Sequence, residues 1–276
     1  MHAPYLKMHG TGNLILVVDR RDDDLPPPDG EKIRELGNAD TGPGFDQMMW
    51  IGPASDASCI ASYRVFNADG SEVEQCGNGV RCVAKYLSGI DNSGAEFSLQ
   101  SPAGAITARV HSNGLVTISM GTPGFEPASI PFIAESAAES YKLGVADDEI
   151  EISAVSMGNP HAVLQVNDVN TAPVGELGPK IECHERFPES ANVGFMCILD
   201  RQNIDLRVYE RGVGETAACG TGACAAVVSG QRLGLLDEEV RVHLPGGQVM
   251  VSWHGGEATA WLKGNAELIN EGMMDL

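Results

Sequence analysis

Cys76-Gly77-Asn78-Gly79 and Cys219-Gly220-Thr221-Gly222 lie 143 residues apart and reveal how this chain is organised. Each motif follows a related tripeptide, because Arg64-Val65-Phe66 and Arg207-Val208-Tyr209 each begin twelve residues before the cysteine. The same offset carries three downstream residues onto counterparts, namely Pro102 onto Pro245, Gly104 onto Gly247 and Gly121 onto Gly264. An ordered series of matches at one offset indicates an internal duplication in which each half supplies one thiol.

Looser matches extend the duplication upstream, where a small motif precedes a strand-like apolar run in each half. The motifs with their runs are Gly12-Asn13 with Leu14–Val18, Gly158-Asn159 with Ala162–Val166, Gly44-Phe45 with Met48–Ile51, and Gly194-Phe195 with Met196–Leu199. Their offsets are 146 and 150 residues, so short insertions separate the halves there.

Each half is predicted to contain many short strands and one central helix. Turn residues bound short β-rich runs at Ile106–Val110, Leu115–Met120, Val240–Leu244, Val249–Trp253 and Ala258–Leu262. After each Cys-Gly-x-Gly motif the apolar spacing becomes helical, as at Val80, Val83, Ala84 and Leu87. Minor helices are expected at Glu31–Leu36 and around Glu135–Leu143.

The chain is therefore expected to form two half-domains of mixed α/β (α+β) class. The Pro-rich connection from Thr122 to Pro131 is the best candidate boundary. We predict an N-terminal half-domain of residues 1–122, completed by 266–276, and a C-terminal half-domain of residues 123–265.

Composition limits the classes of function. The formal net charge of −20 argues against binding of nucleic acid through a general basic surface. The chain has no apolar run near the roughly 18 residues of a membrane span, and Met1–Gly10 has no signal pattern. These features predict a cytoplasmic protein that binds neither nucleic acid nor membrane.

The seven cysteines fit neither a disulfide framework nor a metal site. Their number is odd, no Cys-x-x-Cys is present, and Cys183-His184 are adjacent. Single cysteines such as Cys82 and Cys224 are typical buried small hydrophobic residues. Cys76 and Cys219 differ because each stands in a polar, glycine-rich turn.

A cysteine just before a helix faces unpaired backbone N–H groups and the positive end of the helix dipole. Both features favour the thiolate, so we expect the pKa of Cys76 and Cys219 to be lowered towards working pH. The glycines allow the backbone to approach a ligand and to offer N–H groups to a carboxylate. One thiolate could then remove an α-proton while the opposite thiol returns a proton to the other face, which inverts a stereocentre.

Other interpretations of these residues stay open from the sequence alone. Gly212-x-Gly214-x-x-Ala217 formally matches a dinucleotide fingerprint, but Gly220 and Gly222 interrupt the helix that it needs. The two thiols could also form a redox pair, although such pairs usually lie two residues apart. Asn residues in Gly-Asn turns commonly stabilise the turn itself. Glu210-Arg211 is typical of an exposed charged pair at the end of a strand.

Taken together, the motifs resemble those of the diaminopimelate epimerase family over nearly the whole chain. The matching segments are Met8–Asn13, Gly44–Gln47, Phe66–Glu72, Gln75–Cys82, Ser156–His161, Ala191–Phe195, Tyr209–Gly212 and Ala218–Gly222. The resemblance implies two pseudosymmetric domains, each a β-barrel-like sheet around a central helix, with the site in the cleft. It also implies a cofactor-independent reaction that interconverts LL- and meso-diaminopimelate in lysine and peptidoglycan precursor synthesis.

The resemblance further assigns roles to residues. Cys76 and Cys219 would be the two acid/base thiols, and His161 and Glu210 would tune them and polarise the α-amino end. Residues that would hold the substrate are Asn13, Gln47, Asn67, Asn159, Asn192, Glu210 and Arg211, with the backbone of Gly77, Asn78, Gly220 and Thr221. Many members dimerise near the C-terminus, so the resemblance allows a homodimer, although Ile269–Gly272 lacks the aromatic residue often found there.

Two rival functions remain. The first is a proline or hydroxyproline racemase-like member of the same superfamily, which typically carries His after the first Cys-Gly, where this chain has Asn78. Phenazine-type isomerases of this fold fit less well because they usually lack the paired thiols. A non-catalytic binding or redox relic would carry Cys76 and Cys219 as a reversible disulfide. A relic would not need the full set of substrate-facing residues, so the epimerase is the favoured hypothesis.

Overall fold

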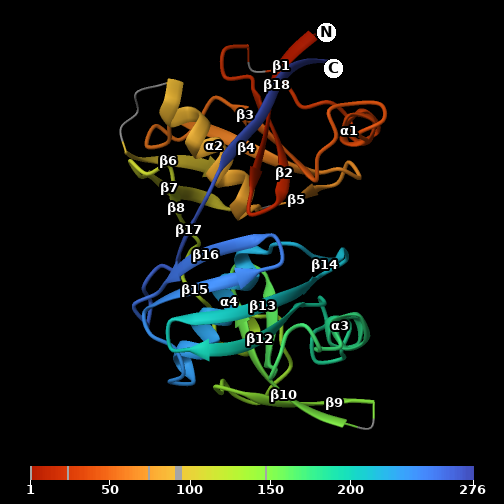
Figure 1. The fold of residues 1–276 in the computed structure, drawn as a ribbon, viewed down its shortest axis with the longest axis vertical. Helices are drawn as coiled ribbons and strands as arrows, with labels where there is room; N and C mark the ends of the chain where they lie inside the picture. Colours follow the sequence, from red (N-terminus) through yellow and green to blue (C-terminus); the bar gives the residue numbers. More distant parts are fainter. Residues whose placement is uncertain (1, 24, 74, 91–94, 147) are drawn as a thin grey trace. The chain divides into compact units, whose positions relative to one another are not determined.

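The computed structural model describes residues 2–23, 25–73, 75–90, 95–146 and 148–276. The chain forms two compact units, one of Met1–Ser119 with Lys263–Leu276 and one of Met120–Leu262. Figure 1 traces both units along the sequence. No helix among the described residues is both long and apolar enough to span a membrane.

The first unit is a mixed sheet with two helices. Its elements are β1 (His2–Gly10), β2 (Asn13–Asp19), α1 (Gly30–Gly37), β3 (Gln47–Gly52), β4 (Ala61–Asn67), β5 (Glu72–Val73), α2 (Gly77–Ile90), β6 (Glu96–Ser101), β7 (Gly104–Val110), β8 (Val116–Ser119) and β18 (Glu267–Asp275). Neighbouring strands pair in the order β18, β1, β2, β3, β4, β6, β7 and β8. The β2–β3 and β4–β6 pairs are parallel and the others are antiparallel.

The second unit repeats this order. Its elements are η1 (Pro127–Ser129), β9 (Tyr141–Val145), β10 (Asp148–Ser156), β11 (Pro160–Gln165), α3 (Val174–Glu182), β12 (Asn192–Asp200), β13 (Asn203–Glu210), β14 (Gly214–Thr216), α4 (Gly220–Arg232), β15 (Glu239–Leu244) and β16 (Gly247–Ser252). A further strand, β17, is Trp261–Gly264. Antiparallel β10–β11 and β12–β13 pairs alternate with parallel β11–β12 and β13–β15 pairs, as in the first unit.

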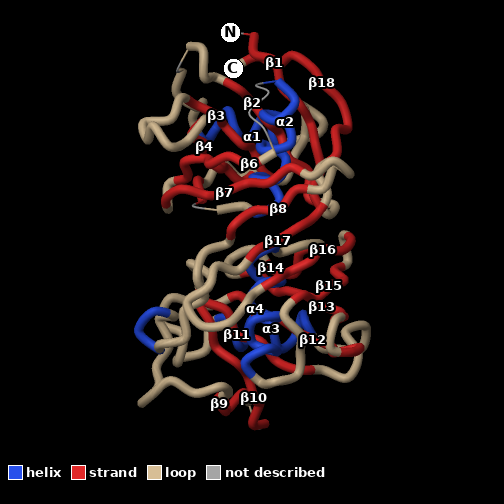
Figure 2. Tube along the Cα trace, turned by 90° about the vertical axis from the view of Figure 1, so that its left-hand side faces the viewer, coloured by secondary structure: helices blue, strands red, loops and turns tan. Residues whose placement is uncertain are grey.

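The duplicated frame appears directly in the element boundaries. α2 and α4 begin at Gly77 and Gly220, which are 143 residues apart, and β7 and β16 begin at Gly104 and Gly247, at the same separation. α2 packs against β1, β2, β3, β7 and β8, and α4 packs against β10, β11, β12, β13, β15 and β16. Each central helix therefore lies among the strands of its own unit, as Figure 2 shows for α4. The expected fold class, an α/β duplication with one central helix per half, is confirmed.

The central helices are held by apolar side chains on nearly every side. In α2 the buried residues include Val80, Cys82, Val83, Ala84 and Leu87, and Ala223–Gly230 of α4 are all buried. A helix that is apolar around most of its surface belongs in a core rather than at a surface. The N-terminus of each helix is consequently fixed by the packing of its whole length.

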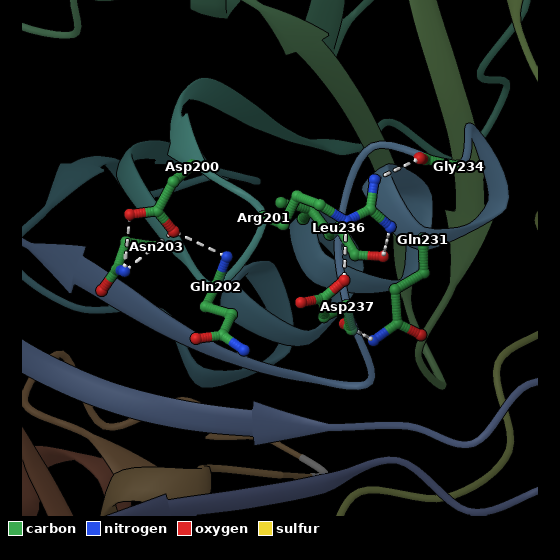
Figure 3. A network of polar contacts seen from close by, with 8 residues as sticks. All are labelled: Asp200, Arg201, Gln202, Asn203, Gln231, Gly234, Leu236 and Asp237. Carbon is green, nitrogen blue, oxygen red and sulfur yellow. Dashed lines mark hydrogen bonds and ion pairs between the residues drawn. The ribbon is translucent and has the colours of Figure 1, made fainter.

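The C-terminal end of α4 is anchored by a polar network around Arg201 in the β12–β13 turn (Figure 3). Arg201 pairs with Asp237 at 2.7 Å and donates to the Gly234 carbonyl oxygen at 3.0 Å. Gln231 donates to the Asp237 carbonyl oxygen at 2.8 Å. Arg201 thus holds the turn that follows α4, and Gln231 ties the last turn of the helix to the same segment.

Two local predictions need correction. The helix expected around Glu135–Leu143 is wrong, because β9 occupies Tyr141–Val145 with buried and exposed residues in strict alternation. That period of two belongs to a strand and outweighs the helix-favouring composition before it. The sequence does not predict the helix α3, because it contains the poor helix formers Gly175, Gly178 and Pro179. The helix expected at Glu31–Leu36 is confirmed as α1.

Candidate active site

Cys76 lies immediately before α2, as the sequence predicts. Its carbonyl oxygen accepts from the Val80 N–H at 2.9 Å, and its Sγ accepts from the Gly79 N–H at 3.2 Å. The side chain is buried, with Cys76 only 9% exposed. The sulfur therefore points to the amide end of the helix, where an N–H group stabilises negative charge on it.

A glycine at position 79 is required by the packing beneath this turn. A Cβ atom there would lie 2.4 Å from Sδ and 3.0 Å from Cγ of Met49 in β3. Met49 is itself fully buried. The absence of a side chain lets the start of α2 rest directly on the sheet, which fixes the height of Cys76 above it.

Arg81 forms a buried support under the same turn. The fully buried guanidinium donates to Asn78 Oδ1 and to Thr11 Oγ1, both at 2.9 Å, and to the Asn265 carbonyl oxygen at 3.1 Å. A Cβ on Gly10 would lie 3.2 Å from this guanidinium, and a Cβ on Gly264 would lie 3.0 Å from it. Arg81 thus bonds the side chain of Asn78. The backbone of Asn78 stays in the first turn of α2, at the helix N-terminus.

Three expected substrate-binding amides form one hydrogen-bonded chain across β2, β3 and β4. Asn13 Nδ2 donates to Gln47 Oε1 at 3.4 Å, and Gln47 Nε2 donates to Asn67 Oδ1 at 3.0 Å. Gln47 and Asn67 are opposite each other in the antiparallel register of β3 and β4. Asn67 Nδ2 continues the chain by donating to Ser71 Oγ at 3.1 Å.

This row of hydrogen-bonded amides leaves one acceptor oxygen without a protein partner. Within the described ranges, Asn13 Oδ1 is buried and has no hydrogen-bond partner. Buried acceptors are nearly always satisfied, and leaving one unsatisfied costs about 1–3 kcal/mol. An N–H donor of a ligand, such as an ammonium group, would satisfy it.

Cys219 occupies the equivalent place in the second unit. It is the N-cap residue of α4, with extended backbone (φ −116°, ψ 112°), and its carbonyl oxygen accepts from the Ala223 N–H at 3.0 Å. Its Sγ lies 3.6 Å from Thr221 Oγ1, and the residue is only 4% exposed. Both thiols are therefore buried at the start of a central helix.

The polar surroundings of Cys219 overturn the expectation that its pKa is lowered. Burial raises the pKa of Cys219 well above its usual value, and the negative charge and hydrogen bond of Glu210 raise it further. The Thr221 hydroxyl and the Gly222 N–H act in the opposite direction but do not prevail. Burial and an adjacent carboxylate disfavour a thiolate more than the helix terminus favours it. Cys219 is accordingly held as a neutral thiol.

A relay of polar side chains connects Cys219 with His161 on β11. Asn159 Nδ2 donates to Thr221 Oγ1 at 3.4 Å, and Asn159 Oδ1 lies 2.9 Å from His161 Nε2. Burial and the nearby charge of Arg211 lower the pKa of His161 to about 3. His161 is therefore neutral, and its Nε2–H donates to Asn159 Oδ1.

Asn192 and Arg211 form a second group in this unit. Asn192 Oδ1 accepts from the Arg211 N–H at 3.0 Å, and Asn192 Nδ2 donates to the Pro160 carbonyl oxygen at 3.1 Å. Asn192 is opposite His161 in the parallel register of β11 and β12. Arg211 is exposed and donates to the Glu189 carbonyl oxygen at 3.0 Å. Its guanidinium can still offer further N–H groups to a carboxylate.

The structure thus joins most of the expected residues within their own unit. In the first, Asn13, Gln47 and Asn67 are one chain, while Cys76, Gly77 and Asn78 follow one another at the start of α2. In the second, Cys219 contacts Thr221, the charge of Glu210 acts on the Cys219 thiol, and Asn159 joins Thr221 to His161. Gly220 begins α4 beside them.

Sequence reasoning missed two residues that support these groups. One is Arg81, and the other is Thr216, whose Oγ1 donates to Glu210 Oε1 at 2.5 Å. A comparison of the two halves at the 143-residue offset gives a signal for Thr216, because its counterpart is the apolar Val73. Among the described residues, no group of three or more His, Cys, Asp or Glu side chains is arranged to hold a metal ion.

Comparisons with known proteins agree on one family. Residues 5–126 and 153–269 match the family model described as "Diaminopimelate epimerase". The chain is 47% identical over 279 residues to a diaminopimelate epimerase of Chromobacterium violaceum, and 48% identical over 277 residues to one of Nitrosomonas europaea. Each match covers 100% of both chains.

A solved structure shares the fold at low sequence identity. A Bacillus anthracis phenazine biosynthesis protein of the PhzF family superposes with a TM-score of 0.71 at 18% identity, and the match covers 100% of both chains. Similarity at this level of identity supports the fold.

Proposed function

This chain belongs to the diaminopimelate epimerase family, and from that premise we propose that Cys76 and Cys219 are the proton-transfer groups with which it interconverts LL- and meso-diaminopimelate. The observation that carries the proposal is the duplicated placement of a buried cysteine at the start of each central helix. Inversion at a carbon needs one group to remove a proton and another to supply one from the opposite face. We assign these two roles to the two thiols, one from each half.

The proton transfers balance without any redox change. The thiolate form of one cysteine takes the α-proton, so that a C–H bond breaks and an S–H bond forms. The thiol of the other cysteine then gives its proton to the opposite face of the same carbon, and the roles reverse in the other direction. Because cysteine side chains supply both the base and the acid, the proposed reaction needs no pyridoxal cofactor.

In one direction Cys219 acts as the acid. Glu210 favours the protonated sulfur, while the Thr221 hydroxyl and the Gly222 N–H stabilise the thiolate that remains after proton transfer. The amide groups of Gly77, Asn78, Gly220 and Thr221 would stabilise the charge that develops on the substrate carboxylate.

The remaining polar residues are proposed to recognise a substrate with an ammonium and a carboxylate at each end. Asn13 Oδ1 is the acceptor to which an ammonium group would donate. Gln47 and Asn67 fix its orientation through the chain of amides. Asn192 holds the backbone of Arg211, whose guanidinium would pair with a carboxylate, and His161 holds Asn159 as a neutral donor.

The decisive experiment uses protein freed of metal and pyridoxal phosphate and incubated with LL-diaminopimelate in heavy water. We expect the meso isomer to form with deuterium at Cα. Turnover of hydroxyproline with none of diaminopimelate would instead favour the proline racemase-like alternative. No turnover of either amino acid, together with a titratable Cys76–Cys219 disulfide, would favour the relic.

The homodimer and the cytoplasmic location are further proposals. Analytical ultracentrifugation tests the first, and fractionation of cells that express the protein tests the second. The net charge of −20 supports the expectation that nucleic acid is not a partner.

A further inference from the structure

Thr216, at the end of β14, forms a side-chain hydrogen bond with Glu210. Its Oγ1 donates to Glu210 Oε1 at 2.5 Å. Glu210, at the end of β13, lies near enough to the Cys219 sulfur for its negative charge to raise the pKa of that thiol. β13 also meets the turn that holds Cys219, because a Cβ atom on Gly222 would lie 3.0 Å from Val208 Cγ2 and 3.3 Å from Cys219 Sγ. The Thr216 hydroxyl therefore bonds a carboxylate that lies beside the sulfur of the same unit.

The duplicated frame allows this position to be compared with its counterpart in the same chain. Arg207 forms a bidentate ion pair with Glu215 at 2.6 and 2.7 Å. Its counterpart Arg64 forms the same pair with Glu72, with both contacts at 2.7 Å. The two short strands β14 and β5 are thus clamped in the same way in both halves.

The register of the short strands agrees as well. Val208 is paired with Thr216 in β13 and β14, and Val65 is paired with Val73 in β4 and β5. Thr216 and Val73 are 143 residues apart, so they occupy equivalent places on equivalent strands. The backbone at this place accepts either a hydroxyl-bearing or a purely apolar β-branched side chain.

Thr216 and Val73 differ together with a second pair of equivalent residues. The counterpart of Glu210 at the same offset is Asn67, a neutral amide that Gln47 and Ser71 already hold. A carboxylate accepts hydrogen bonds but donates none, so it needs a donor to fix its rotamer. Only the half with the carboxylate has the hydroxyl at the end of the short strand.

We propose that Thr216 is a positioning residue that fixes the Glu210 carboxylate beside the Cys219 thiol and so aims that thiol for proton donation. The proposal rests on the proposed function for its effect on turnover. Its effect on the thiol itself can be measured without turnover. No bond is made or broken at Thr216.

Removal of the hydroxyl gives two linked expectations. Without its donor the carboxylate can rotate away from the sulfur, which removes the negative charge and the acceptor that favour the thiol. The Cys219 thiolate then forms at lower pH. A displaced acid group also lowers turnover, because small misplacements of a reacting group cost about tenfold to hundredfold in rate.

The test compares Thr216→Val, which copies the side chain of the first half, with Thr216→Ser, which keeps the hydroxyl. In each full-length protein the rate of iodoacetamide alkylation at Cys219 is measured against pH, with peptide mass spectrometry to separate Cys219 from the exposed Cys183. We expect the valine variant to shift the midpoint of this profile downward by about one pH unit, a tenfold change. We expect the serine variant to retain the parent midpoint.

Turnover gives an independent readout. The valine variant should lose about tenfold or more in kcat with little change in KM, and the serine variant should recover most of that loss. Val73→Thr is the matched control, because it adds the hydroxyl to the half without a carboxylate and should leave the Cys219 profile unchanged. Thermal unfolding of each variant shows whether the fold is intact.

The outcomes separate the two proposals. An unchanged Cys219 profile in a folded valine variant, or a serine variant as impaired as the valine one, would overturn the role of Thr216. A parent chain with no epimerase activity, but with the expected shift at Cys219, would overturn the proposed function and leave the positioning role standing.

Discussion

The burial of His161 predicts that the second unit loses stability as the pH falls below 6.5. In the folded chain the pKa of His161 is about 3, against 6.5 for an unperturbed histidine, because burial and Arg211 disfavour the charged ring. Between these two pKa values, His161 binds a proton in the unfolded chain and remains unprotonated in the folded chain. The free energy of unfolding therefore rises with pH in this window and falls on acidification.

The size of the effect follows from the two pKa values. At pH 5 an unfolded-state pKa of 6.5 and a folded-state pKa of about 3 give a loss of about 2 kcal/mol relative to pH 8. His161→Gln supplies the reference, since glutamine keeps a side-chain N–H for Asn159 Oδ1 and does not titrate. The variant starts from lower stability because of its altered packing, so only the difference between the two pH values is compared.

Urea titrations at pH 5 and pH 8 measure this difference in both proteins without substrate. The parent protein should lose about 2 kcal/mol more than the variant between the two pH values. Histidine NMR signals give a direct check, because the His161 ring should remain neutral at pH 5. Equal pH dependence in parent and variant, or a His161 resonance that titrates near pH 6.5, would refute the reasoning.

Three further predictions concern the individual site groups. Cys76→Ala and Cys219→Ala should each abolish epimerisation, as followed by loss of deuterium incorporation at Cα, and full activity in either would exclude a two-thiol reaction. Asn13→Ala removes the unsatisfied Oδ1 acceptor and should raise KM by about tenfold with a smaller effect on kcat, as steady-state kinetics would show; an unchanged KM would mean that no substrate donor reaches this oxygen. Arg81→Met leaves the Asn78, Thr11 and Asn265 acceptors without this donor and should lower the free energy of unfolding by about 3 kcal/mol, and a urea midpoint equal to that of the parent would contradict the supporting role of Arg81.

The central architecture was predictable because its signals are local and repeated. The apolar spacing after Cys76 and Cys219 predicted α2 and α4, and the turn residues predicted strands such as β7 and β15. Each half tests the other, since a pattern seen twice at one offset is unlikely to arise by chance. The failure at Glu135–Leu143 arose at β9, which pairs with β10, whereas β1, the equivalent of β10, pairs with β18, so the repeat gave no check there.

The pKa of Cys219 could not be read from its sequence position. The motif reveals the helix terminus, which favours a thiolate. It does not reveal that the side chain is only 4% exposed or that the carboxylate nine residues earlier raises the pKa of the thiol. Those depend on how the β13–β14 hairpin brings Glu210 back towards Cys219 and on how α4 packs among the strands of its unit, which a local pattern leaves undetermined.

Comparison of the two halves separates what the fold requires from what the chemistry requires. The Arg–Glu clamps at Arg64 and Arg207 and the glycines at the helix starts are shared, so they serve the common frame. Asn67 and Glu210 are equivalent in position but differ in charge, and Val73 and Thr216 differ together with them. A site with two identical halves would suit a substrate that presents the same groups to both halves. The proposed reaction acts on an amino-acid carbon that carries three different groups besides its hydrogen, so the proposed roles call for different neighbours at the two thiols. The pair of Glu210 and Thr216 is where the second half departs from the first beside Cys219.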